Sequence, residues 1–93
     1  MVFDWSNEKN EKLKKERNIQ FEEIVVAIQN GGLVRRLQHT NPEKYSDQEL
    51  LLVILNDYVY VVPAVPTGNG YFLKTIYKSR KYTRMILGDK NER

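Results

Sequence analysis

The side chains best able to do chemistry are concentrated near the end of the sequence. Between residues 74 and 84 there are five basic side chains and no acidic one, and aromatic side chains precede and interleave them. The basic residues are Lys74, Lys78, Arg80, Lys81 and Arg84, and the aromatic residues are Tyr71, Phe72, Tyr77 and Tyr82. Cations neutralise phosphates and aromatic rings stack on unpaired bases. The stretch therefore indicates a local cationic and aromatic surface.

A second group of candidate residues falls on one predicted strand. Arg35 and His39 share a face of that strand and Arg36 lies on the other, so the arginines could meet a phosphate backbone across a sheet. His39 is the only histidine and the natural acid or base, because an imidazole exchanges its proton near neutral pH. The alternative, a histidine bonded to backbone beside a loop, is favoured for an isolated histidine.

Composition excludes several classes of function. The chain of 93 residues has room for one domain, and its net charge of +3 is by itself weak evidence for a nucleic-acid partner. There is no cysteine and only one histidine, which excludes disulfides and zinc sites built from thiolates or several histidines, and no cofactor is expected. The longest apolar run, residues 50–55, is too short to span a membrane. We expect a soluble, cytoplasmic protein.

Two helices are expected in the first third of the chain. Val2–Trp5 alternates like a short edge strand, and Ser6 can cap a helix over Asn7–Arg17 that Asn18 would end. A second helix begins near Phe21, where apolar residues recur at helical spacing, and ends at the glycines that follow Asn30.

The rest of the chain predicts strands and one short C-terminal element. We expect strands over Leu33–Thr40, Gln48–Leu55, Tyr58–Val65 and Tyr71–Tyr77, followed by a short basic helix or tail over Ser79–Leu87. The order predicts an α+β fold in which two N-terminal helices pack on one side of a four-stranded antiparallel sheet.

The strand over residues 58–65 alternates two kinds of side chain. Val59 and Val61 point to one face, which we expect to be core, while Tyr58 and Tyr60 point to the other. These tyrosines could stack on bases, but packing on the sheet or against a partner is the preferred interpretation.

Three spaced motifs carry a resemblance to a known family. The opening Phe3–Asn10, the segment Ile19–Glu23 with its Ile-x-Phe-Glu-Glu pattern, and the closing Ile76–Thr83 with Ser-Arg-Lys-x-Thr occur in the family's order. The sequence resembles the BrnT-like toxins of type II toxin–antitoxin systems, within the RelE/ParE ribonuclease superfamily. Arg17 stands where the family usually has a histidine, and Gln48-Glu49 stands where a basic residue is common.

The resemblance implies a single RelE-like toxin domain over residues 1–93. It implies a metal-independent endoribonuclease that cleaves mRNA, free or on the ribosome, and inhibits translation. A cognate antitoxin would neutralise it in a heteromeric complex, such as a heterotetramer. A noncatalytic RNA-binding or interaction module on the same fold is the alternative, and a ParE-like gyrase poison is a less favoured one.

Roles for individual residues follow from the resemblance and from the chemistry of RNA cleavage. Arg80 is the first candidate for phosphate binding, because a planar guanidinium can hold two phosphate oxygens at once. Lys78 and Lys81 would assist it, and His39 is the remaining catalytic candidate. The predicted RNA-binding residues are Arg17, Arg35, Arg36, Lys74, Tyr77, Tyr82 and Arg84.

Overall fold

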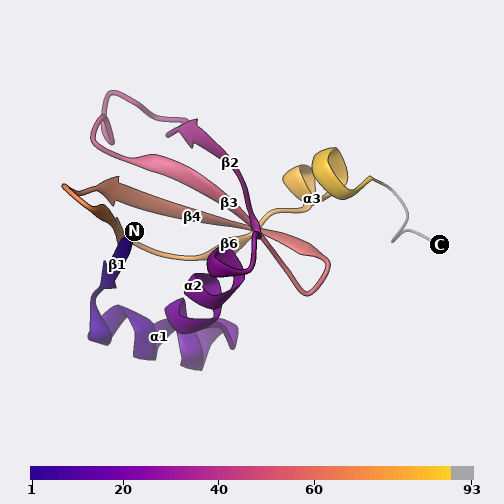
Figure 1. The fold of residues 1–93 in the computed structure, drawn as a ribbon, viewed down its shortest axis with the longest axis horizontal. Helices are drawn as coiled ribbons and strands as arrows, with labels where there is room; N and C mark the ends of the chain where they lie inside the picture. The colour runs from indigo at the N-terminus through magenta and orange to yellow at the C-terminus, as the bar shows by residue number, and fades with distance from the viewer. Residues whose placement is uncertain (89–93) are drawn as a thin grey trace.

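The computed structural model describes residues 1–88, which form an α+β fold of three helices and six strands (Figure 1). The helices are α1 (Asn7–Arg17), α2 (Phe21–Gln29) and α3 (Arg80–Leu87). The strands are β1 (Val2–Trp5), β2 (Leu33–Gln38), β3 (Glu49–Leu55), β4 (Tyr58–Pro66), β5 (Gly70–Leu73) and β6 (Tyr77–Lys78).

The sheet is mixed, in the order β1-β5-β4-β3-β2, with β6 also paired to β4. Its antiparallel part, β2 to β6, follows the predicted meander, but β1 joins β5 in parallel, from Val2 opposite Gly70 to Trp5 opposite Leu73. A side chain at position 70 would collide with the Val2 carbonyl, so glycine permits this pairing. The prediction of two helices on a four-stranded antiparallel sheet was therefore wrong in strand number and in strand direction.

The strand predicted over residues 71–77 is broken in two. Leu73 pairs with Ala64, but Tyr77 rather than Ile76 pairs with Val61, so one extra residue is inserted between β5 and β6. Such an insertion is a β-bulge, which re-aims the side chains around it. Here Ile76 points into the core, while Tyr77 and Lys78 are exposed.

A buried asparagine joins the two N-terminal helices. The Gln20 side chain makes no capping bond at the start of α2, and Asn10 of α1 does so instead. Its Oδ1 accepts a hydrogen bond from the Phe21 N–H at 2.8 Å, and its Nδ2 donates to the Glu22 carboxylate at 2.8 Å. The second bond holds the pKa of Glu22 below its usual value. The pair of bonds satisfies Asn10 and fixes α2 against α1.

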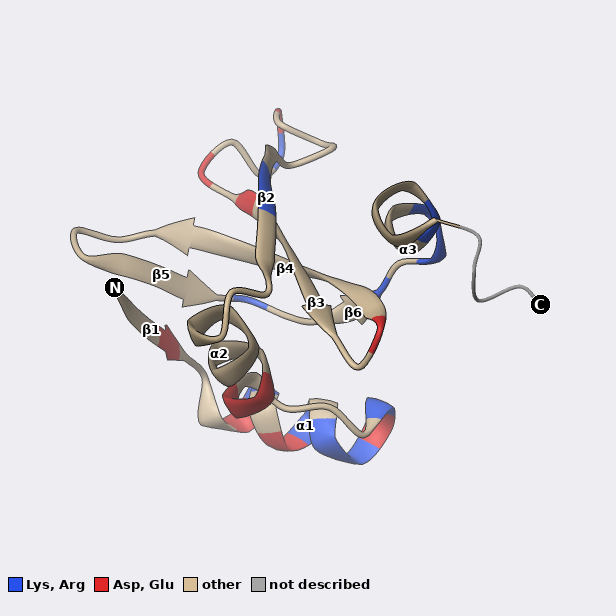
Figure 2. Ribbon diagram, turned by 45° about the vertical axis from the view of Figure 1, so that its right-hand side comes forward, with Lys and Arg blue, Asp and Glu red and all other residues tan. Residues whose placement is uncertain are grey.

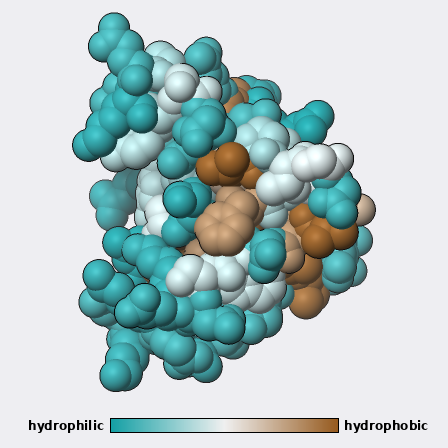
Figure 3. All heavy atoms as spheres, turned by 90° about the vertical axis from the view of Figure 1, so that its left-hand side faces the viewer, coloured by the Kyte–Doolittle hydropathy of each residue, from teal (hydrophilic) through white to brown (hydrophobic). Residues whose placement is uncertain are grey.

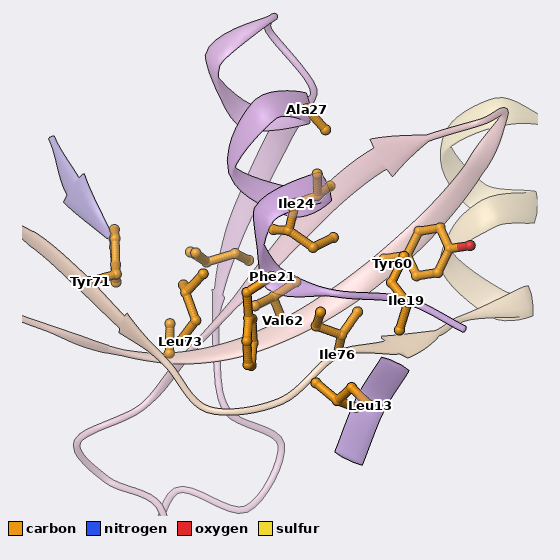
Figure 4. Close-up of a cluster of buried hydrophobic side chains, with 13 residues drawn as sticks. Leu13, Ile19, Phe21, Ile24, Ala27, Tyr60, Val62, Tyr71, Leu73 and Ile76 are labelled. Carbon is orange, nitrogen blue, oxygen red and sulfur yellow. The ribbon is translucent and has the colours of Figure 1, made fainter. Parts of the chain in front are cut away.

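The main core lies between α1, α2 and one face of the sheet (Figure 4). It contains Leu13, Ile19, Phe21, Ile24, Ala27, Leu51, Val53, Tyr60, Val62, Ala64, Tyr71, Leu73 and Ile76. A smaller core lies on the opposite face, where α3 packs Tyr82, Ile86 and Leu87 against strands β3 and β4. The helices therefore cover both faces of the sheet, which the predicted two-layer arrangement did not include.

The two faces of β4 differ from the prediction. Val59 and Val61 are buried as expected, but in the smaller core beneath α3. Tyr60, only 9% exposed, belongs to the main core, and Tyr58 packs at its margin. The tyrosine face therefore belongs to the main core and the valine face to the smaller one, and Tyr60 packs within this chain.

No helix within residues 1–88 has the length and the apolar character that crossing a bilayer requires.

Candidate nucleic-acid interface

The structure divides the predicted site residues between two regions. The first, called here the β6–α3 surface, consists of Tyr77, Lys78, Arg80, Lys81 and Tyr82. The second, called the β2–β5 network, consists of Arg36, Tyr71 and Glu49, which are joined by hydrogen bonds. Of the remaining candidates, Arg17 and Arg84 flank the first region, His39 lies near the second, and Arg35 and Lys74 lie apart from both.

Backbone and hydroxyl contacts fix the β6–α3 surface on strand β4. Ser79 caps α3 by accepting a hydrogen bond from the Tyr82 N–H at 3.0 Å, and its own N–H donates to the Val59 carbonyl. One turn later, the buried Thr83 hydroxyl accepts a bond from the Val59 N–H at 2.8 Å. The carbonyl and the N–H of Val59 are thus both bonded to the start of α3, and these two bonds position Arg80 and Lys81.

Within residues 1–88, the cations of this surface form no ion pair with an acidic side chain. Lys78, Arg80 and Lys81 are exposed, and in the described part of the chain the one ion pair within 4.0 Å joins Lys14 to Glu11 on α1. Figure 2 shows basic residues and no acidic ones on α3, whereas α1 carries both signs. Positive charge therefore accumulates at this end of the sheet.

The start of α3 runs against the usual preference of helices. The N-terminal end of a helix carries partial positive charge and favours acidic side chains, yet α3 begins with Arg80 and Lys81 and has no acid in its first turn. Two cations at this end do not help the helix to form. They do strengthen the local attraction for an anion such as phosphate.

Aromatic rings accompany the cations. Tyr77 is 41% exposed, and the Tyr82 ring is half-buried. The Lys81 ammonium lies 5.4 Å from the centre of the Tyr82 ring, and that of Lys78 lies 5.3 Å from the Tyr58 ring. Partial burial raises the pKa of Tyr77, with a smaller contribution from Tyr82, so its hydroxyl is protonated at neutral pH.

Two further candidates flank this surface. The Arg17 guanidinium donates a hydrogen bond to the Ile76 carbonyl at 2.6 Å, which ties the end of α1 to the bulge before β6. Arg84 is exposed in the last turn of α3. The structure therefore brings Arg17 and Arg84 to the elements that carry Lys78 and Arg80.

The β2–β5 network contains arginine and tyrosine in a different setting. Arg36 of β2 donates to the Tyr71 hydroxyl at 3.3 Å, and this hydroxyl donates to the Glu49 carboxylate at 2.7 Å. Burial, and next the bond to Glu49, raise the pKa of Tyr71. The sheet curls enough for a β2 side chain to reach β5 past two intervening strands. Arg36 is thus part of a hydrogen-bonded network that ties β2 to β5.

His39 lies near this network and away from Arg80. Its Nδ1 accepts a hydrogen bond from the Asn41 N–H at 3.1 Å, and its ring packs on Tyr45 with centroids 4.4 Å apart. His39 follows Gln38, which pairs with Glu49 at one end of β3. Helix α3 is bonded through Thr83 to Val59, which lies near the other end of β3. Val59 pairs with Ile54, which is five residue steps along β3 from Glu49, so at about 3.3 Å per step these two points are about 16 Å apart. The favoured backbone-bonded interpretation of His39 agrees with these contacts.

The last two candidates occupy separate places. Arg35 is exposed on the edge strand β2, where it lines a shallow pocket with Met1 and Val34. Met1 and Val34 are exposed apolar residues. Figure 3 shows exposed apolar side chains, in brown, among hydrophilic ones on the face at the left of Figure 1. Lys74 lies 5.4 Å from the Phe72 ring at the end of β5. In the described part of the chain, no side-chain hydrogen bond, ion pair or ring contact joins either residue to the β6–α3 surface.

Sequence reasoning missed two functional contacts. Thr83 stood in the closing motif, but its bond to β4 depends on which face α3 covers. Glu49 was noted only as a departure from the family, and its link to Tyr71 depends on the curl of the sheet. Among residues 1–88, no group of three or more His, Asp or Glu side chains is arranged to hold a metal ion.

No protein family, curated protein or solved structure matches this chain in the comparisons with known proteins.

Proposed function

We propose that this protein binds single-stranded RNA at the β6–α3 surface and acts there as an endoribonuclease toxin that cleaves mRNA and inhibits translation. The observation that carries the proposal is the gathering of Lys78, Arg80 and Lys81 beside the exposed Tyr77 and the half-buried Tyr82, with no carboxylate paired to them in residues 1–88. The BrnT-like motifs support the same function, because the closing motif supplies Ser79, Arg80 and Lys81.

The surface supplies part of the chemistry that RNA cleavage needs. The 2′-hydroxyl loses its proton to solvent water, and the 2′-oxygen then attacks phosphorus, which forms a 2′,3′-cyclic phosphate and breaks the bond to the 5′-oxygen. The extra negative charge on phosphorus must be stabilised. Arg80 can hold two phosphate oxygens, and the lysines add positive charge. The protonated Tyr77 hydroxyl can donate to the departing 5′-oxygen. No metal is required in this scheme.

The proposal includes a protein partner. An antitoxin with an acidic segment would cover the β6–α3 surface and neutralise its charge, and a heterotetramer is the assembly proposed. The complex would act in the cytoplasm, on RNA that is free or bound to the ribosome.

A second candidate is a noncatalytic RNA-binding module. The observation that favours it is the position of His39, the only imidazole, which is held by Asn41 and Tyr45 at the far end of β3. The β6–α3 surface would then bind RNA without the imidazole most often used for proton transfer.

Inducible expression in bacteria tests the proposal. The wild type is compared with Arg80→Ala at matched soluble levels, and the 5′ ends of cellular RNA are mapped after induction. Growth arrest with new mRNA ends, both lost in the variant, is the expected result. Arrest without new ends would contradict ribonuclease activity and favour a target such as gyrase. No arrest from folded wild type would favour the noncatalytic module.

A further inference from the structure

A pocket of about 350 Å³ lies between the end of α1 and strand β6. It is lined by Arg17, Ile19, Tyr60, Ile76, Tyr77 and Lys78. Its volume falls in the range of sites that take small molecules, about 300–1,000 Å³. It adjoins the β6–α3 surface, because Tyr77 and Lys78 belong to both.

The inner wall of the pocket is apolar and part of the main core. Ile19, Tyr60 and Ile76 are all buried there, and Figure 4 shows these three side chains at one end of the cluster. Core side chains are closely packed and hold their positions. Ile76 is fully enclosed, whereas Ile19 and Tyr60 keep a small exposed fraction, so together with the exposed Tyr77 ring these two offer a preformed surface on which a flat ring could lie.

The rim of the pocket is cationic. Arg17 is held in place by its 2.6 Å bond to the Ile76 carbonyl, and a guanidinium has five N–H donors, so others remain for an anion. Lys78 stands on β6 with its ammonium over the Tyr58 ring. In the described residues, neither cation forms an ion pair with a carboxylate. Apolar wall and cationic rim together suit a ligand with a flat body and a negative charge.

We propose that this pocket takes the base of one unpaired nucleotide of the bound RNA, with Arg17 and Lys78 holding its phosphate. The inference rests on the proposed function and adds a nucleotide subsite to it. The base presents a flat face to the apolar wall, as bases do on aromatic platforms. Lys78 is two residues before Arg80, so a strand lying on the first turn of α3 passes the mouth of the pocket.

Nuclear magnetic resonance with adenosine 5′-monophosphate tests the pocket directly. The methyl signals of Ile19 and Ile76 report on the apolar wall, and ribose 5-phosphate provides the control because it has the phosphate without the base. We expect saturable shifts of both methyl groups with the nucleotide and not with ribose 5-phosphate. Equal shifts with both compounds, or none, would overturn the proposal.

Binding of a fluorescent single-stranded oligonucleotide separates this inference from the proposed function. Arg17→Gln should weaken binding about tenfold, the size expected for one charge-assisted contact. Lys12→Gln, an exposed lysine on the same helix, is the matched control and should change binding less than about twofold. One outcome is tight binding that Arg80→Ala weakens and Arg17→Gln does not, with no methyl shifts. This outcome would overturn the nucleotide pocket and leave the RNA proposal standing. Methyl shifts without oligonucleotide binding would overturn the RNA proposal.

Discussion

The β6–α3 surface and the β2–β5 network both contain arginine and tyrosine, but these residues have different roles in the two regions. In the network, a chain of hydrogen bonds runs from Arg36 through Tyr71 to the Glu49 carboxylate, and β2 is tied to β5. On the surface, Arg80 and Lys81 stand at the start of α3 beside Tyr82, with no acidic residue in that helix. The comparison teaches that the position of a single carboxylate decides whether an arginine serves the fold or is left for a ligand.

Burial separates the two regions as well. The Tyr71 ring is 5% exposed and belongs to the main core, whereas Tyr77 is 41% exposed. Both phenols have a raised pKa, in each case chiefly through loss of solvent. Only the exposed ring can stack on a ligand, so we expect changes at the two sites to affect different properties.

The largest expected effect is the loss of RNA affinity on Arg80→Ala. Charge-assisted hydrogen bonds contribute about 1.5–3 kcal/mol each, which corresponds to a loss of about tenfold or more in the binding constant. Arg80→Lys keeps the charge without the planar fork and should retain part of the affinity. Anisotropy of a labelled single-stranded RNA measures both. Equal affinities for the wild type and the alanine variant would remove Arg80 from the site.

The next effect concerns the attachment of α3. Thr83→Val is close in shape but leaves the buried Val59 N–H without its partner, which costs about 1–3 kcal/mol in the free energy of unfolding. Urea denaturation measures this loss. We also expect RNA affinity to fall, because α3 carries Arg80 and Lys81. A variant with unchanged stability would show that this bond does not hold α3 on the sheet.

A smaller effect is expected in the network. Tyr71→Phe removes the bonds to Glu49 and Arg36 and keeps the buried ring, so the free energy of unfolding should fall by about 1 kcal/mol. RNA affinity should stay within error of the wild type. If this variant loses RNA binding while it remains folded, the division between the two regions is wrong.

The smallest effect is a pH dependence of stability. The pKa of Tyr71 is raised in the folded chain, so the folded state holds the phenolic proton more tightly than the unfolded chain does. Its stabilisation is fully present below the ordinary tyrosine value of 10.0 and is lost as pH rises through the raised pKa. Denaturation curves from pH 8 to 11 should show a shallower decline for Tyr71→Phe. If stability declines equally steeply with pH in the wild type and in Tyr71→Phe, Tyr71 is not the origin of the pH dependence.

The parts of the fold that local chemistry determines could be predicted from the sequence. Helix α1 runs over Asn7–Arg17 as expected, because Ser6 caps it and Asn18 adopts the left-handed conformation that ends it. Asn56 and Asp57 join β3 to β4 in a tight turn with positive φ at both residues, a conformation that Asn and Asp adopt in two-residue hairpin turns. Strand β2 ends at Gln38, short of the predicted Thr40, where His39 bonds to Asn41.

Features that depend on distant segments could not be predicted. The parallel pairing of β1 with β5, the bulge before β6 and the side covered by α3 each bring together residues far apart in the chain. Of the predicted cationic and aromatic surface, residues 77–82 lie together because they are consecutive, whereas Tyr71 is buried in the main core and Lys74 lies apart at the end of β5. The separation of His39 from Arg80 could not be predicted, since it follows from their places at opposite ends of β3.

The salt dependence of RNA binding tests the central claim most directly. For single strands, each phosphate contact contributes about 0.7 to the slope of log K against log salt concentration. We predict that Arg80→Ala lowers this slope by about that amount, while Arg36→Ala leaves it unchanged, because Arg36 lies beside the Glu49 carboxylate and away from the β6–α3 surface. A slope reduced by Arg36→Ala and not by Arg80→Ala would place the RNA on the β2–β5 network and contradict the account.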